Sequence, residues 1–76
     1  MNAQPQDLKD ELLRTDEEFH NLAVKHHELE GRLQALTTKH YLSGPEQLEE
    51  VTLKKRKLQL KDRMEDILRQ YRQGQA

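Results

Sequence analysis

The chain contains no cysteine and no tryptophan, and its 76 residues include only three glycines and two prolines. Without cysteine it forms neither disulfides nor thiolate zinc sites, which suits a reducing compartment. No apolar run approaches the roughly 18 residues of a membrane span, and the N-terminus lacks the basic and apolar regions of a secretory signal. We therefore expect a cytoplasmic protein with no membrane partner.

Large apolar side chains are also scarce. Hydrophobic residues make up 33% of the chain and charged residues 36%, with one Phe and two Tyr. A short chain buries a smaller share of its surface than a larger protein does, so a spacious enzyme cavity is not expected. The composition is typical of coiled-coil proteins. We expect one small helical domain over residues 1–76, with burial so thin that self-association adds to its stability.

Charge of one sign is not in excess, since the formal net charge is −1, but charge is arranged in blocks. Residues 7–18 carry six acids against two bases, a net of −4, and residues 54–63 carry six bases against one acid, a net of +5. The overall balance argues against a protein drawn to nucleic acid or acidic lipid by its total charge. The basic block remains a local candidate for an anion contact.

Apolar spacing predicts a short helix followed by a long one. The short helix is expected over about residues 5–14, with Pro5 at a first helical position. Thr15 followed by Glu18 fits a capping box and predicts a break there, with a continuous helix as the alternative. The long helix, about residues 16–40, carries a heptad seam. The seam residues are Phe19, Leu22, His26, Leu29, Leu33, Leu36 and His40.

The second long helix follows a turn at about residues 41–45. Gly44 suits a left-handed conformation there, and Pro45 disfavours helix before it. The helix is expected over about residues 46–72, and residues 73–76 should fray. One stripe of it carries Leu53, Leu60, Met64 and Ile67. The predicted fold is all-α, an antiparallel, coiled-coil-like two-helix hairpin with the short N-terminal helix as an appendage.

Antiparallel pairing about this turn predicts which side chains meet. It brings Phe19 beside Ile67 or Leu68, and Leu22 near Met64. Leu29 falls level with Leu58 or Leu60.

Four histidines could suggest a metal-binding site, but their spacing in the sequence does not support one. No two of His20, His26, His27 and His40 are four residues apart, and a histidine with Glu30 supplies two ligands where zinc needs three or four. His26 lies on the seam, where a polar residue can fix register. The sequence shows no Gly-rich phosphate loop and no strand pattern for a nucleophile elbow. We expect no metal, no cofactor and no catalytic residue, and hence no enzyme.

The basic block is the best candidate for an anion contact, because clustered Lys and Arg neutralise phosphates and release counterions. The candidate residues are Lys54, Lys55, Arg56 and Lys61. No aromatic side chain accompanies them, and acids lie nearby in the sequence. The alternative is that the block solvates the hairpin or pairs with the acidic first helix.

Self-association is expected through apolar side chains that the hairpin leaves uncovered. Val51 and Leu58 project from nearly the opposite side of the second long helix to its apolar stripe. A homodimer forming a four-helix bundle covers them, with Gly31 and Ala35 allowing close approach.

The alternative is that the N-terminal helix covers the apolar side chains that the hairpin leaves exposed. Its residues Leu8, Leu12 and Leu13 can fold back within the same chain and leave a monomer.

The pattern F-x-x-L-x-x-x-H-x-x-L-E, from Phe19 to Glu30, followed by LKKRKLQLKDRM after the turn, resembles the YdcH-type family of small bacterial proteins. The resemblance spans about residues 7–72, and its most specific part is K-K-x-K-L-x-L-K-D, which begins at Lys54. Two departures are visible: Thr15-Asp16-Glu17 stands where the family often has an Asn-Pro break, and Glu30 replaces the commoner Asp. The resemblance implies a helical hairpin and a family of undefined activity, with no functional residues to carry over.

These observations predict an uncharacterised helical-hairpin protein that acts as a non-enzymatic protein–protein interaction or structural module, with an unidentified protein partner. The alternative is weak, sequence-independent binding of RNA or another polyanion through residues 54–61.

Overall fold

The described part of the chain, residues 5–74, folds into three helices. The computed structural model describes the backbone of residues 5–74 and the side chains of residues 7–74. The helices are α1 (Pro5–Thr15), α2 (Glu17–Thr37) and α3 (Gly44–Gly74), and no strand occurs between residues 5 and 74. The fold is therefore all-α, as predicted. No helix in this part of the chain is long and apolar enough to cross a membrane.

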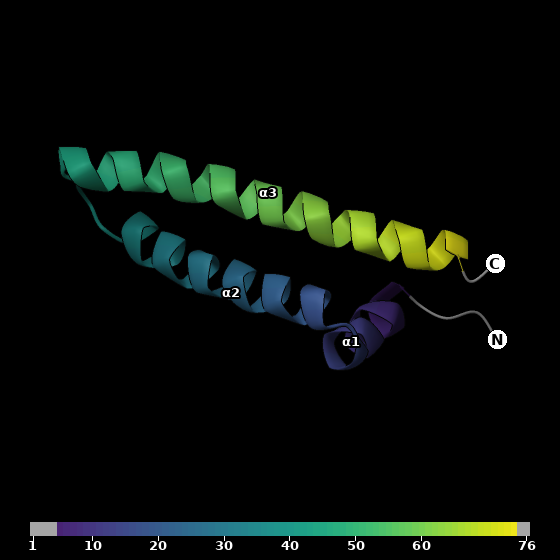
Figure 1. Ribbon diagram of the computed structural model, residues 1–76. Helices are drawn as coiled ribbons and strands as arrows, with labels where there is room; N and C mark the ends of the chain where they lie inside the picture. Colours follow the sequence, from purple (N-terminus) through teal and green to yellow (C-terminus); the bar gives the residue numbers. More distant parts are fainter. Residues whose placement is uncertain (1–4, 75–76) are drawn as a thin grey trace.

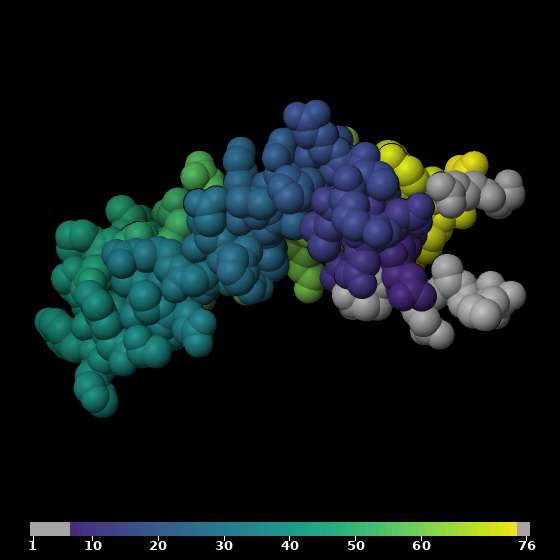
Figure 2. Space-filling model, turned by 90° about the horizontal axis from the view of Figure 1, so that it is seen from below, coloured from purple at the N-terminus to yellow at the C-terminus, as the bar shows by residue number. Residues whose placement is uncertain are grey.

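The helices form an elongated molecule with extents of 50 × 19 × 18 Å. Figure 1 shows α3 turning back after α2 and running beside it, while α1 lies at an angle across the end where α2 begins. The space-filling view shows α1 and the first turns of α2 gathered at that end (Figure 2). The end of α3 lies at Gly74 and not at about residue 72, so residues 73 and 74, which were expected to fray, are helical. Residues 1–4, 75 and 76 lie outside the described residues.

The break between α1 and α2 is a single residue, Asp16, with extended backbone angles of φ −109° and ψ 111°. Its side chain accepts a hydrogen bond from the N–H of Phe19 at 2.8 Å, so Asp16 is the N-cap of α2. The expected capping box of Thr15 and Glu18 is wrong by one residue. Thr15 is the last residue of α1, and its hydroxyl donates to the carbonyl of Glu11.

The connection between α2 and α3 contains the capping box of the molecule. The N–H of Ser43 donates to the Glu46 carboxylate at 3.0 Å, and the N–H of Glu46 donates to the Ser43 hydroxyl at 3.3 Å. Gly44 and Pro45 consequently belong to the first turn of α3, and no glycine between residues 5 and 74 has a positive φ. The left-handed Gly44 expected from the sequence is wrong.

The end of α2 also differs from the predicted boundary. This helix stops at Thr37, three residues before the predicted end, and Thr38 is its C-cap. The hydroxyls of Thr37 and Thr38 donate to the carbonyls of Gln34 and Ala35, which satisfies acceptors that the helix end leaves unpaired. His40 therefore lies outside the helix and cannot extend the seam.

One buried cluster lies where all three helices meet, and Leu33 and Leu36 of α2 are buried farther along the helix pair. Leu12 of α1, Phe19 of α2 and Ile67 of α3 are exposed by only 2%, 0% and 3%, and they form one buried cluster. The partly buried side chains packed against it are Leu8, Leu22, Met64, Leu68 and Tyr71. Phe19 and Ile67 thus share one cluster, as the antiparallel pairing predicts. The expectation that the N-terminal helix is an appendage is wrong, because Leu12 is part of the core.

Candidate functional site

The basic run of α3 is divided among different sides of the helix. An α-helix turns by about 100° per residue, so Lys54 and Arg56 project about 200° apart. Lys54, Lys57 and Lys61 are spaced by three and four residues, and they line one groove between α2 and α3. Arg56 lines the groove on the opposite side. Of the predicted anion contacts, the structure brings Lys54 and Lys61 together and separates Arg56 from them.

The groove that holds the three lysines has an apolar floor and one acidic side chain. Leu33 of α2, which is buried, and Leu58 of α3, which is exposed, both line it, together with Glu30. The Lys57 ammonium lies 3.4 Å from the Glu30 carboxylate. We call this surface, lined by Glu30, Leu33, Lys54, Lys57, Leu58 and Lys61, the lysine groove.

The neighbours of the basic run neutralise only part of its charge. Lys54 lies 3.8 Å from Glu50 on its own helix, and Lys57 is paired with Glu30 across the helices. Lys55, Arg56 and Lys61 form no ion pair with the described side chains. Exposed pairs contribute little to stability, so the positive potential of this part of α3 is largely open to solvent.

The predicted self-association residues fall on opposite sides of the molecule. Val51 and Leu58 are 64% and 58% exposed, and each stands two residues before a partly buried leucine of α3. Both therefore point away from the buried side of α3, and Leu58 also lines the outer part of the lysine groove. Gly31 and Ala35 stand two residues on either side of Leu33, which is buried, so they point away from α3. A Cβ added at Gly31 would meet no atom within 4 Å.

His26 offers no metal site in the described part of the chain. Its Nδ1 lies 3.6 Å from the Glu30 carboxylate, and its Nε2 is buried without a hydrogen-bond partner among the described residues. No group of three His, Asp or Glu residues suited to a metal ion occurs among these residues.

Two arginines of the helix pair bind carboxylates through two hydrogen bonds each. Arg32 of α2 donates from Nε and Nη2 to Glu49 of α3, both at 2.8 Å. Arg63 of α3 donates to Glu18 of α2 at 2.9 and 3.1 Å. The Arg32 guanidinium lowers the pKa of Glu49. These bidentate contacts fix the two helices relative to one another more specifically than lysine contacts do.

Glu46 links the start of α3 to the connection. The Lys39 ammonium and the Ser43 N–H both donate to its carboxylate, and they lower the pKa of Glu46 to about 2. The charged form of Glu46 is therefore part of the structure that begins α3.

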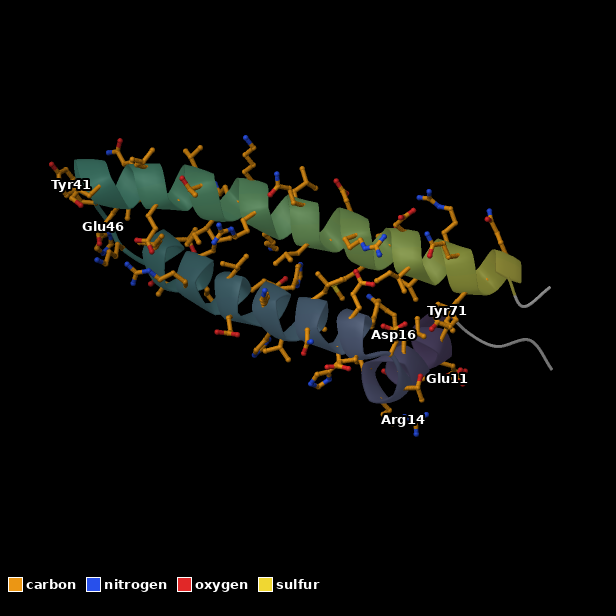
Figure 3. All side chains as sticks on the ribbon, in the orientation of Figure 1. Glu11, Arg14, Asp16, Tyr41, Glu46 and Tyr71 are labelled. Atoms are coloured by element: carbon orange, nitrogen blue, oxygen red, sulfur yellow. The ribbon has the colours of Figure 1, made fainter. Side chains whose placement is uncertain are left out.

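The opposite end of the molecule is joined by a second carboxylate. The Tyr71 hydroxyl of α3 donates to Asp16 at 2.8 Å, and the two side chains approach one another in Figure 3. The hydrogen bond from the Phe19 N–H, followed by that from Tyr71, lowers the pKa of Asp16. The same Asp16 raises the pKa of Tyr71. Asp16 thus caps α2 and holds the last turns of α3 beside the break.

A comparison with protein families matches residues 19–68 to DUF465, a family described as protein of unknown function. This segment is more than half of the chain. The chain belongs to the DUF465 family. YdcH is a member, so the resemblance predicted from the sequence is confirmed. Searches of curated proteins and of solved structures returned no match.

The DUF465 segment contains the paired parts of α2 and α3 and leaves α1 outside. It begins at Phe19 and ends one residue after Ile67, so it contains two of the three residues of the buried cluster. The third, Leu12, and the Asp16–Tyr71 hydrogen bond lie outside the matched segment. The lysine groove lies wholly within it.

Three features of the structure were missed in the sequence. The S-x-x-E pattern of Ser43 and Glu46 was visible, but the Gly-Pro between them was interpreted as a turn. Lys57 was not among the predicted anion contacts, although its spacing from Lys54 and Lys61 places the three on one side of a helix. The bond between Asp16 and Tyr71 has no local sequence signal, because it joins residues from opposite ends of the chain.

Proposed function

We propose that this DUF465 protein is a non-enzymatic interaction module. It is an antiparallel, coiled-coil-like hairpin that binds another protein chain through the side of α3 that faces away from α2. The observation that carries this proposal is the exposure of Val51 and Leu58, seven residues apart and hence on one side of the helix. Leu48, also exposed, extends the apolar surface toward the start of α3. We define Leu48, Val51 and Leu58 as the open face.

A second copy of the chain is the proposed occupant of the open face. A small chain with few buried side chains gains stability when a symmetric dimer covers apolar surface. Support comes from Figure 3, in which no other helix lies along the upper edge of α3. One symmetric interface uses either the open face or the edge of Gly31 and Ala35, because the two point in opposite directions. The open face carries the larger apolar side chains, so we assign the dimer to it.

Sedimentation of the protein over a concentration series tests the dimer. Wild type is expected to pass from monomer to dimer, and Leu58→Glu is expected to remain monomeric because it places a charge on the apolar contact. Ala35→Glu is the matched control, and it should dimerise like wild type. A monomer mass at every concentration up to the millimolar range would refute the dimer.

Salt gives an independent test of the same interface. Lys54 and Lys55 lie between Val51 and Leu58 in the sequence, so a symmetric contact of α3 with α3 brings lysines of two copies together. Screening of this repulsion should make the dimer tighter as salt concentration rises. Weaker dimerisation at high salt would contradict an interface built on the open face.

The second candidate function is sequence-independent binding of RNA or another polyanion through Lys54, Lys55, Arg56 and Lys61. It is favoured by the ammonium and guanidinium groups of the last three, which have no acidic partner among the described side chains. A mobility shift of a uniform RNA should then weaken steeply with salt and be lost in a Lys54/Lys55/Arg56→Glu variant. This salt dependence is opposite to that of the dimer. No shift at low salt would remove this candidate.

We further propose that the protein is bacterial and cytoplasmic. The YdcH-type resemblance supports a bacterial source, and a sequence without cysteine suits a reducing compartment. Cell fractionation with an antibody against the protein tests the location, and recovery outside the cytoplasmic fraction would contradict it.

A further inference from the structure

The lysine groove differs from the rest of the α2–α3 junction in combining an apolar floor with unbalanced positive charge. Three ammonium groups stand on its α3 wall, and Glu30 is the acid on its α2 wall. The groove on the opposite side carries two basic side chains and one acidic one, and its leucines are partly buried. The lysine groove is therefore the side on which both exposed apolar surface and net positive charge are available.

The molecule itself shows how such a junction is covered. At the other end of the helix pair, α1 packs Leu12 between Phe19 and Ile67. Residues 7–11 of α1 carry three acids and one base, so the first half of α1 is acidic and lies beside an apolar edge. Figure 1 shows that α1 extends over only the end of the pair, which leaves the lysine groove beyond its reach.

We propose that the lysine groove binds an acidic amphipathic helix of a partner protein. The apolar edge of that helix covers Leu33 and Leu58, and its Glu or Asp side chains face the ammonium groups of Lys54, Lys57 and Lys61. Such helix-in-groove binding places anchors at spacings of three and four residues. This proposal rests on the proposed function as an interaction module and names the chemistry of the partner.

The positive charge of the groove and its exposed leucine favour an acidic helix over a second copy of the chain or a nucleic acid. A second copy docked on the same groove through α3 brings its own lysines to the three that are already there. A nucleic-acid backbone neutralises the lysines but leaves the two leucines in water, since phosphates supply no apolar contact. An acidic helix satisfies both, and the aliphatic stems of the lysines pack along its apolar edge.

The binding test uses a fluorescent synthetic peptide of about 14 residues, or about four helical turns. It carries leucines at spacings of three and four with glutamates beside them, and a matched peptide has glutamine at each glutamate. Anisotropy should show the glutamate peptide binding the full chain at least about tenfold more tightly than the glutamine peptide at low salt. The advantage should shrink as salt rises, because the charges are exposed. Equal affinity for the two peptides would overturn the proposal.

Substitutions in the chain test whether the peptide binds in the lysine groove. Lys57→Gln combined with Lys61→Gln should weaken binding of the glutamate peptide by about tenfold, and Leu58→Ala should weaken binding of both peptides. Lys25→Gln, in the opposite groove, is the matched control and should leave the affinity unchanged. Circular dichroism verifies that each variant keeps its helices. A loss in Lys25→Gln equal to that in the double variant would overturn the assignment to the lysine groove.

The same preparations separate this proposal from the proposed dimer and from RNA binding. Peptide binding by a protein that sediments as a monomer upholds the groove and refutes the dimer. A chain that dimerises at high concentration but binds neither peptide at concentrations where it is monomeric refutes the groove and leaves the dimer standing. Uniform RNA that binds through Lys57 and Lys61 while the glutamate peptide does not would overturn the helix partner in favour of a polyanion.

Discussion

The two ends of the helix pair hold together by different means. Near the break at Asp16, α1 joins α2 and α3, and the three helices bury Leu12, Phe19 and Ile67. Toward the connection, only α2 and α3 are present, and bidentate or single ion pairs such as Arg32–Glu49 and Lys57–Glu30 join them. Apolar side chains of α3 in this second region remain exposed.

The difference shows what a third helix contributes. Two helices can cover only one stripe of each other, so a helix with apolar side chains on two sides keeps one of them in water. Where α1 is present, a third stripe completes the core. In the other region Leu33 and Leu36 are buried and polar contacts also join the pair, but apolar side chains of α3 are left for another chain. The following changes test this contrast, from the largest expected effect to the smallest.

Replacing Phe19 tests the three-helix end directly. Phe19→Ala should lower the free energy of unfolding by about 3–5 kcal/mol, because it removes a fully buried ring. Urea unfolding followed by circular dichroism measures this. Val24→Ala, at an exposed position of the same helix, is the control and should change little. If Phe19→Ala unfolds the chain, Phe19→Leu should give a smaller, measurable loss. Equal effects at Phe19 and Val24 would contradict the contrast.

Replacing neighbouring leucines tests whether α1 belongs to the core. Leu12→Ala should lower the free energy of unfolding by at least about 2 kcal/mol, as expected for a buried leucine. Leu13→Ala truncates a leucine of the same helix at a position that is 36% exposed, so the loss in free energy of unfolding should be much smaller. Thermal unfolding of the two variants side by side decides this. Equal losses would mean that α1 is not packed as described.

Substitutions at the break test which residue caps α2. Asp16→Ala should cost about 1 kcal/mol, because it removes the acceptor for the Phe19 N–H. Thr15→Ala should cost less, since the Thr15 hydroxyl bonds within α1. Tyr71→Phe should reproduce only the part of the Asp16 effect that comes from the hydroxyl. Urea unfolding gives the comparison, and a larger loss at Thr15 than at Asp16 would restore the capping box predicted from the sequence.

Acid should remove the contribution of Glu46 at the connection. Its folded-state pKa of about 2 lies below its ordinary value of 4.5. The unfolded chain therefore takes up the proton first, and the stability from the charged form is present above about pH 4.5 and lost as pH falls toward 2. The difference in unfolding midpoint between wild type and Glu46→Gln should be largest at neutral pH and shrink through this window. A difference that is independent of pH would contradict the role of the charge.

Sequence periodicity was enough to predict three helices and the seam positions of α2 as far as Leu36, but the expected seam residue His40 lies outside the helix. Phe19 and Leu36 fall at heptad positions, and both are fully buried. Cap positions were less certain because Thr15 and Asp16 are both good caps and lie side by side, so only tertiary contacts choose between them. The docking of Leu12 depends on the angle between α1 and α2, which no local pattern encodes. The separation of Lys54 from Arg56 was predictable from helical geometry, but the run was interpreted as one surface.

Because the single residue Asp16 joins α1 to α2, an insertion at this point changes how the two helices lie relative to one another. Helical hydrogen bonds flank it directly, from the N–H of Asp16 to the carbonyl of Leu12 and from the N–H of His20 to the carbonyl of Asp16. One inserted residue that extended either helix would turn α1 by about 100° relative to α2 and carry Leu12 away from Ile67. The six residues between α2 and α3, 38–43, include no core side chain and can absorb such a change. Length variation in this fold should therefore be accepted at the connection and rejected at the break.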